Sequence, residues 1–221
     1  MKRTVLSLGF LFSILIVAAQ IKPYHTTGMG TNYSYALIDD TENGRVIPRY
    51  APFWNINNNY HFDFSKNFGM FAGYSIGNVG FIVEWNDSLK TKKKFRTYNI
   101  GVPIAFKIGT FDPDEPFYFF FGGAMEIPFH FKEKTFYDGK KVKKTREWGS
   151  ERVNLLQPCL FVGITFPNKN TLKFSYYPMD FLNTGYTENI NGTPYQPYAN
   201  FLHSNIIMIT YGAGLTRVKK K

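Results

Sequence analysis

Apolar and polar residues alternate with a period of two in several segments of the chain, and this alternation predicts β-strands. In the clearest segment, 54–64, large apolar residues share one face. On the opposite face lie Asn55, Asn57, Asn59, His61 and Asp63. The same period recurs at 98–108, 117–131 and 207–215, and weaker alternation predicts strands at about 26–37, 69–84, 153–166 and 171–180. The facing of 69–84 stays open, whereas 117–131 is expected to keep one register from end to end.

The connections between these eight predicted strands alternate in length along the chain. Short joins near 65–68, 109–116 and 167–170 are rich in turn residues, and longer ones are expected near 38–52, 85–94, 132–152 and 183–200. In an up-and-down barrel every second connection emerges at the same end, as in barrels with short periplasmic turns and long external loops. The sequence therefore predicts an all-β fold, an eight-stranded antiparallel up-and-down transmembrane β-barrel.

A soluble barrel of the lipocalin type also alternates, with its apolar face turned inward. Three features favour the membrane version over it. Lumen-side charged residues, namely Lys107, Glu126, His130 and Lys173, can pair across the lumen with neighbouring Asn and Tyr. Gly and Ala stand opposite Phe-rich runs, which suits a narrow lumen, and aromatic residues gather near strand ends, as in interfacial girdles.

The first residues are typical of a secretory signal peptide. Lys2 and Arg3 precede an apolar run at 5–17, which is too short for a membrane-spanning helix, and Ala18-Ala19-Gln20 offers a cleavage site. We expect a signal peptide at 1–19 and one barrel domain at 20–221.

Two strand segments carry a resemblance to a known group. The run 98–109 reads Tyr-Asn-Ile-Gly-Val-Pro-Ile-Ala-Phe-Lys-Ile-Gly, and 71–81 reads Phe-Ala-Gly-Tyr-Ser-Ile-Gly-Asn-Val-Gly-Phe. With the Ala-Ala-Gln leader end, the chain resembles the small outer-membrane β-barrel domain proteins of Bacteroidota, which include PorT-like proteins. The resemblance implies a location in the outer membrane. Some relatives take part in secretion, a role that these residues do not support.

Composition sharpens this interpretation. The chain has 221 residues with 19% aromatic side chains, which we expect to form a lipid-facing band, and a net charge of +10. The charge clusters in two predicted external loops, in Lys92, Lys93, Lys94, Lys140, Lys141, Lys143, Lys144 and Arg146. Their expected partners are outer-membrane lipid and the anionic groups of lipopolysaccharide. The alternative is a solvated loop, nucleic acid is not an expected partner, and no protein partner is identified.

The inward face predicts a hydrogen-bonded polar network that fills the lumen. Its predicted members are Asn55, Asn57, Asn59, His61, Asp63, Asn99, Lys107, Glu126, His130 and Lys173. A single cysteine excludes a disulfide framework and Cys-rich metal sites. No catalytic, cofactor-binding or metal-binding residue is predicted.

Three functions remain open from the sequence. The first is a non-enzymatic membrane scaffold or interaction module that presents basic external loops. The second is a lipid A-modifying enzyme that uses Ser150, Glu151 and His130 at the external rim. The third is a narrow channel or a secretion-accessory barrel.

Overall fold

The computed structural model describes residues 22–112 and 114–217, without the side chains of residues 53, 54, 216 and 217. The predicted signal peptide at 1–19 therefore lies outside the described residues. Within these ranges no helix is both long and apolar enough to cross a membrane.

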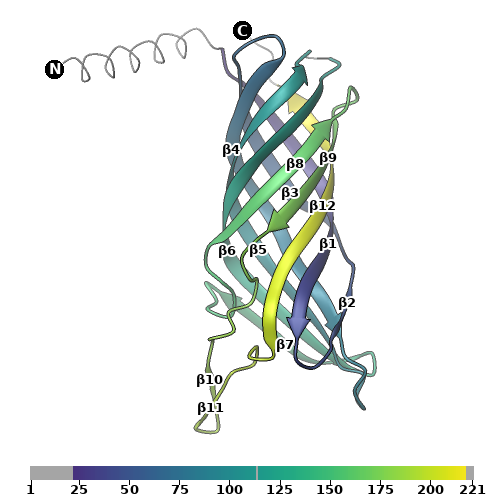
Figure 1. Ribbon diagram of the computed structural model, residues 1–221, viewed down its shortest axis with the longest axis vertical. Helices are drawn as coiled ribbons and strands as arrows, with labels where there is room; N and C mark the ends of the chain where they lie inside the picture. The colour runs from purple at the N-terminus through teal and green to yellow at the C-terminus, as the bar shows by residue number, and fades with distance from the viewer. Residues whose placement is uncertain (1–21, 113, 218–221) are drawn as a thin grey trace, which may run out of the picture.

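Eight strands form a closed ring in which each strand pairs with its neighbour in the ring (Figure 1). They are β1 (Tyr24–Asp40), β3 (Arg49–Asp63), β4 (Phe68–Glu84), β5 (Lys92–Thr110), β6 (Phe117–Tyr137), β8 (Gln157–Thr165), β9 (Asn170–Tyr177) and β12 (Phe201–Arg217). All pairs are antiparallel, and β12 closes the ring against β1. The predicted eight-stranded up-and-down barrel is confirmed.

Four shorter strands extend this ring. β2 (Arg45–Ile47) pairs with β4, and β7 (Lys140–Trp148) pairs with β6. β10 (Glu188–Ile190) and β11 (Thr193–Tyr195) form a separate hairpin that projects from one end of the barrel (Figure 1).

The two ends of the barrel differ in their connections. The short-turn end carries the connections 64–67, 111–116 and 166–169, and the described chain begins and ends there, at the top of Figure 1. The long-loop end, at the bottom, carries 85–91, the β6–β7 hairpin and the segment 178–200.

Strands extend into two of the predicted long loops, slightly into 85–94 and over most of 132–152. β5 begins at Lys92, inside the predicted loop 85–94, and β6 runs on to Tyr137, inside the predicted loop 132–152. Asp138 and Gly139, with φ of 45° and 77°, then form the two-residue turn into β7. The loop prediction was wrong here because it relied on apolar alternation. Beyond the lipid the strands lose that alternation, but backbone hydrogen bonds to their neighbours keep them extended. The connection near 38–52 is likewise shortened by β1, β2 and β3.

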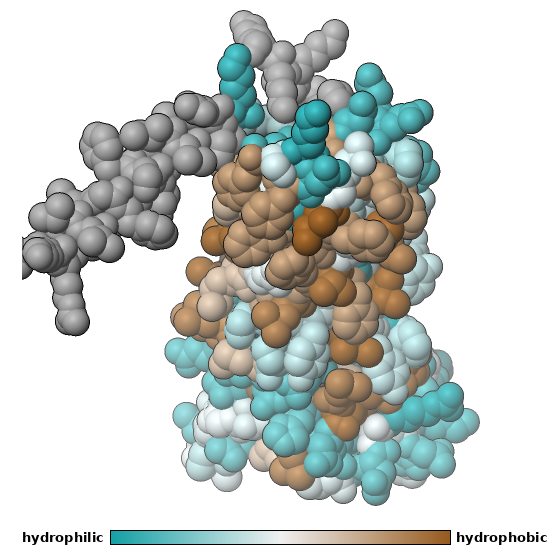
Figure 2. All heavy atoms as spheres, turned by 45° about the horizontal axis from the view of Figure 1, so that its top comes forward, coloured by the Kyte–Doolittle hydropathy of each residue, from teal (hydrophilic) through white to brown (hydrophobic). Residues whose placement is uncertain are grey.

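The outer wall is apolar, as β5 illustrates. Ile100, Val102, Ile104 and Ile108 point outward with 50–55% of their surface exposed, whereas the alternate residues, among them Ala105, are buried. Figure 2 shows hydrophobic residues gathered over the barrel wall, with hydrophilic residues beyond them at the long-loop end. A closed ring satisfies every ladder hydrogen bond, which is the condition for crossing a bilayer with strands. Ring closure and the apolar wall define a transmembrane β-barrel.

The facing of β4, which the sequence left open, is settled by its pairing. Phe71, Val79, Phe81 and Val83 are buried, whereas Tyr74 is half exposed. The odd-numbered residues of β4 therefore point into the barrel.

A β-bulge changes the facing of β6. Tyr98 pairs with His130 and Asn99 with Pro128, which leaves Phe129 as an extra residue. Phe131 is consequently buried inside the barrel at 1% exposure, and His130 shares the outer face with Tyr98. The uniform alternation predicted for 117–131 was wrong, because one inserted residue exchanges the two faces beyond it.

Aromatic side chains close the lumen at the long-loop end. This aromatic plug consists of Phe81, Phe95, Phe131, Phe181, Leu182, Tyr198 and Phe201, all at most 2% exposed. Phe81 and Phe95 lie 5.0 Å apart between ring centroids, and Phe181 from the 178–200 segment packs edge-on against Phe81 at 5.7 Å. The expected lipid-facing band therefore accounts for only part of the aromatic content, because the folded loops need an apolar core of their own.

Candidate functional site

Six cations form a continuous surface on the outside of the barrel at the long-loop end. This basic face consists of Lys94, Arg96, Lys132, Lys134, Lys144 and Arg146. The strand register places Lys94, Lys134 and Lys144 in one cross-strand row over β5, β6 and β7. Arg96, Lys132 and Arg146 form the adjacent row.

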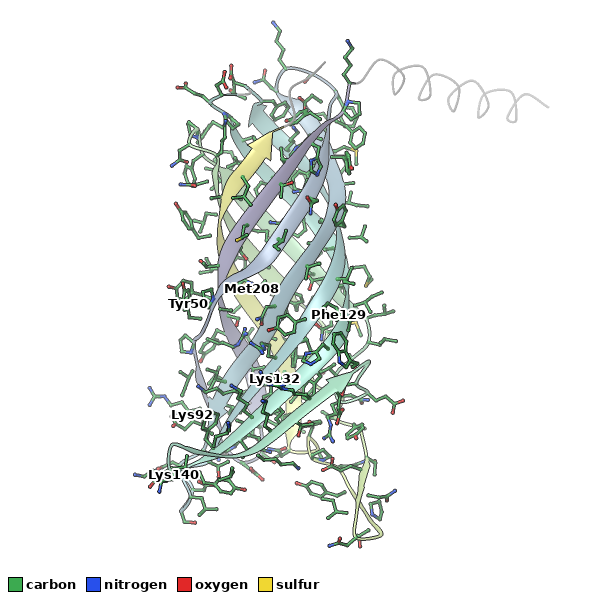
Figure 3. All side chains as sticks on the ribbon, turned by 180° about the vertical axis from the view of Figure 1, so that it is seen from behind. Tyr50, Lys92, Phe129, Lys132, Lys140 and Met208 are labelled. Atoms are coloured by element: carbon green, nitrogen blue, oxygen red, sulfur yellow. The ribbon has the colours of Figure 1, made fainter. Side chains whose placement is uncertain are left out.

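The basic face borders the apolar wall through a row of aromatic rings. The Arg96 guanidinium lies 4.8 Å from the Tyr98 ring centroid, over its face. Beside it, Trp148 is 76% exposed and its ring lies 4.8 Å from His130 and 5.8 Å from Phe129. In Figure 3, Lys132 lies beyond Phe129 towards the long-loop end. The cations therefore begin where the apolar wall ends.

The electrostatics of the basic face favour a bound anion. Like charges directly opposite each other on paired strands are destabilising. Partial desolvation and the positive charges of Arg146, Lys141 and Lys134 lower the pKa of Lys144. In the described parts of the chain, none of the six side chains forms an ion pair.

The predicted basic loop residues fall into three groups. Lys94, Lys144 and Arg146 belong to the basic face. Lys92 is paired with Glu84 at 2.9 Å, and the Lys93 ammonium lies 5.6 Å from the Trp85 ring centroid.

The third group lies at the tip of the β6–β7 hairpin, where Figure 3 labels Lys140. Lys140, Lys141 and Lys143 are all exposed. Arg96, Lys132 and Lys134, cations of the same two predicted basic loops, complete the basic face. The period-two spacing of 92, 94 and 96 and of 132 and 134 is the sequence signal for their shared face.

The lumen near the short-turn end contains a buried ion pair. The Lys107 ammonium lies 2.6 Å from an Asp63 carboxylate oxygen and donates to the Tyr24 hydroxyl at 2.8 Å. It also lies 3.9 Å from the Phe111 ring centroid. The Tyr24 ring stacks on His61 at 4.7 Å. Asp63, Lys107 and His61 of the predicted network thus form one cluster.

A second luminal cluster lies midway along the barrel. The Asn99 amide donates to Glu126 at 2.9 Å and to the Gln157 amide oxygen at 3.1 Å. The Tyr177 hydroxyl donates to the other Glu126 oxygen at 3.1 Å. Asn99 and Glu126, both members of the predicted network, are therefore brought together, and Gln157 and Tyr177 complete the cluster. No periodicity signal marked these two residues as luminal partners.

The remaining predicted luminal residues lie in separate places. Asn55 donates to Asn32 at 3.2 Å in a third cluster. Asn57, Asn59 and Lys173 line a cavity of about 290 Å³ near the short-turn end.

His130 lies outside the lumen, contrary to the prediction, because of the β6 bulge. The polar lining is thus three clusters and a cavity in place of one continuous network.

Two of the residues considered for lipid A chemistry, Ser150 and His130, have other partners. The Ser150 hydroxyl donates to Glu147 at 2.6 Å, and the same carboxylate accepts from Arg152 at 2.9 Å. His130 packs against Trp148 on the outer face. Among the described residues no group of three or more His, Cys, Asp or Glu side chains could hold a metal ion.

Comparison with solved structures finds matches that cover most of the chain at low sequence identity. The chain is similar to Ail, the attachment invasion locus protein of Yersinia pestis, crystallised with the heparin analogue sucrose octasulfate, at 12% identity and a TM-score of 0.39, over 89% of this chain and 99% of Ail. It is also similar to Neisserial surface protein A, at 9% identity and a TM-score of 0.40, over 86% and 96% of the two chains.

No family model matches the chain, and no curated protein matches it. The fold assignment rests on the strand pairing itself, and the resemblance to the PorT-like group stays a prediction.

Proposed function

We propose that the chain is a non-enzymatic outer-membrane protein whose basic face binds the phosphate groups of lipopolysaccharide. The observation that carries the proposal is the pair of cross-strand cation rows at the edge of the apolar wall. Barrels of this architecture belong to outer membranes, where lipopolysaccharide presents anions at the level of the interfacial aromatic girdle. Lys and Arg there gain charge-assisted hydrogen bonds to phosphate.

The proposed orientation puts the short-turn end in the periplasm and the long-loop end outside. Short periplasmic turns and longer external connections are the usual layout of such barrels. The signal peptide expected at 1–19 would supply export across the inner membrane. Under this orientation the basic face lies at the outer surface, where lipopolysaccharide is.

The interior supports a role without transport or catalysis. The side chains of the aromatic plug are at most 2% exposed and leave no room for solute traffic at the long-loop end. The hydroxyl of Ser150, the nucleophile of the alternative enzyme, is held by Glu147. Unaltered lipid A masses in a deletion strain and no conductance in planar bilayers are the expected results. A gained or lost acyl chain would overturn the proposal and favour the lipid A-modifying enzyme.

A charge-reversal pair tests the basic face directly. Lys134→Glu with Lys144→Glu inverts two of the three charges in one row. It should weaken binding to lipopolysaccharide micelles by about tenfold or more, since each charge-assisted hydrogen bond is worth roughly 1.5–3 kcal/mol. The matched control is Lys140→Glu with Lys141→Glu, which makes the same charge change at the hairpin tip.

Affinity is measured by titrating the refolded barrel with the micelles and with dephosphorylated micelles. A selective loss in the first variant, absent with dephosphorylated lipid, supports phosphate recognition. An equal loss in both variants would mean general charge attraction and would overturn the proposal.

A further inference from the structure

The cavity near the short-turn end has the features of a ligand site. It encloses about 290 Å³ and is lined by β1, β3, β9 and β12, among other strands. Small-molecule sites usually measure about 300–1,000 Å³, so it suits a ligand of monosaccharide size. The exposed residues Lys169 and Leu215 belong to its lining, so the cavity reaches the surface at this end.

Glycines create the space. Gly28 of β1 pairs with Gly214 of β12, and both line the cavity together with Gly212. A Cβ atom added at Gly212 would meet its nearest atom at 3.4 Å, an ordinary contact. The backbone does not require glycine there, and a longer side chain at this position would extend into the cavity.

The charge of the lining is positive. Lys173 and Lys169 belong to it, and none of the described aspartates or glutamates does. The Lys173 ammonium lies 5.2 Å from the Phe161 ring centroid and forms no ion pair within the described residues. The nearby carboxylate of Glu126, with which the Lys173 charge interacts, already accepts hydrogen bonds from Asn99 and Tyr177. An anionic ligand group would therefore find an available cation.

Polar side chains beside Lys173 can recognise hydroxyl groups. The Asn59 side chain oxygen is buried without a hydrogen-bond partner, although buried carboxamides are normally paired. Asn57 and Thr210 also line the cavity, and Phe120 and Phe161 supply flat apolar surface. The lining thus combines one available cation, hydroxyl-bonding groups and aromatic faces.

We propose that this cavity binds a small hydroxylated organic anion, such as a sugar acid, that enters at the short-turn end. The carboxylate or phosphate would bind Lys173, and a ligand hydroxyl would bond the Asn57 or Asn59 carboxamide at the cavity wall. The site is separate from the basic face, so either proposal can fail alone.

Ligand-detected NMR of the refolded barrel tests the cavity with glucuronate as the probe. Glucose, the neutral analogue, and benzoate, an anion without hydroxyls, should each bind about tenfold more weakly or worse. Equal binding of glucose and glucuronate, or no binding of glucuronate, would overturn the proposal. A disaccharide that ends in glucuronate tests the source of the ligand. If it binds as well as free glucuronate, the site accepts the ends of glycan chains; if only free glucuronate binds, the ligand is a free sugar acid.

Three variants test whether the glucuronate probe binds in this cavity. Lys173→Gln should weaken glucuronate binding by about tenfold while leaving glucose unchanged, and Gly212→Leu should abolish binding by occupying the space. Lys66→Gln removes an exposed turn lysine at the same end, outside the lining, and should have no effect. If Gly212→Leu does not fold, Lys173→Gln decides. Equal affinity in Lys173→Gln and the native chain would contradict the assignment.

Discussion

The two ends of the lumen are filled by opposite chemistry. At the long-loop end, the aromatic plug packs rings such as Phe81, Phe95 and Phe201 without exposed surface. At the short-turn end, the lumen holds the Lys107–Asp63 ion pair and a cavity with polar walls. The long-loop end is closed by apolar packing, whereas the inward side chains at the short-turn end are held in place by an ion pair and hydrogen bonds.

The two ends differ in lumen chemistry because their connections differ in length and composition. The 178–200 segment has no lipid against which to bury apolar groups, so its Phe181 and Tyr198 side chains pack into the barrel mouth. The short-turn end has only tight connections, which supply no plug, so its inward side chains must satisfy one another. Packing tolerates many apolar substitutions, whereas a buried ion pair depends on both partners.

The largest effect is expected at the short-turn end, from Asp63→Ala. This change leaves the Lys107 ammonium, which is fully buried, without its carboxylate. Loss of one partner of a buried ion pair typically costs about 3–5 kcal/mol of unfolding free energy. Urea unfolding in lipid vesicles, followed by tryptophan fluorescence, measures it.

The double variant Asp63→Ala with Lys107→Met is the control for that change. Because it removes both charges, it should recover most of the lost stability. A double variant as unstable as the single one would mean that shape, and not charge, holds this end.

A somewhat smaller effect is expected in the plug, from Phe95→Ala. The ring of Phe95 contacts Phe81 at 5.0 Å and both Tyr198 and Phe201 at 6.0 Å between centroids. Cavity formation should cost about 3 kcal/mol.

Phe119→Ala, on the outer wall with 58% of the residue exposed, is the matched control and should cost less in the same unfolding measurement. Equal losses at the two positions would show that the plug is no better packed than the lipid-facing surface.

The smallest effect is expected from Arg152→Gln, which releases the segment over the plug. Arg152 bonds Glu147 at 2.9 Å and Glu188 at 2.6 Å, and it lies beside the Tyr198 hydroxyl at 3.4 Å. These bonds raise the pKa of Arg152 and keep it charged. Because the carboxylates are partly exposed, the loss should be about 1–2 kcal/mol.

Faster proteolysis within 178–200, with the barrel intact on a gel, is the expected readout for that variant. Ile190→Ser, at an exposed position of the β10–β11 hairpin, is the control and should leave the cleavage rate unchanged. An unchanged rate in Arg152→Gln would mean that the plug alone holds the segment.

The predicted fold follows from local patterns, and its failures have local causes. The alternation at 98–108 gave correct facing for Asn99 and Lys107, because no irregularity interrupts β5 there. At 117–131 the same reasoning placed Glu126 correctly and His130 wrongly, because the bulge at Phe129 lies between them. A bulge adds one residue without changing the apolar pattern, so sequence periodicity could not reveal it.

The sequence predicted which residue types form the candidate sites, but it did not predict which of these residues lie together. The clusters of Lys and Arg were evident in the sequence, but their surroundings were not. Lys92 forms an ion pair with Glu84, whereas Lys94, two residues further on the same strand, lies beside Lys134 in a row of cations. Which cations share a face depends on the register of three strands. The cavity likewise arises where Gly28 and Gly214 meet across strands far apart in the chain.

The sequence by itself determined the number of barrel strands, the apolar wall and the alternation of short and longer connections, because these depend on side-chain period and turn residues within single segments. Only the tertiary structure decided where the aromatic plug, the ion pair, the basic face and the cavity lie. Each of these joins residues from separate strands, and ring closure with its register brings them together.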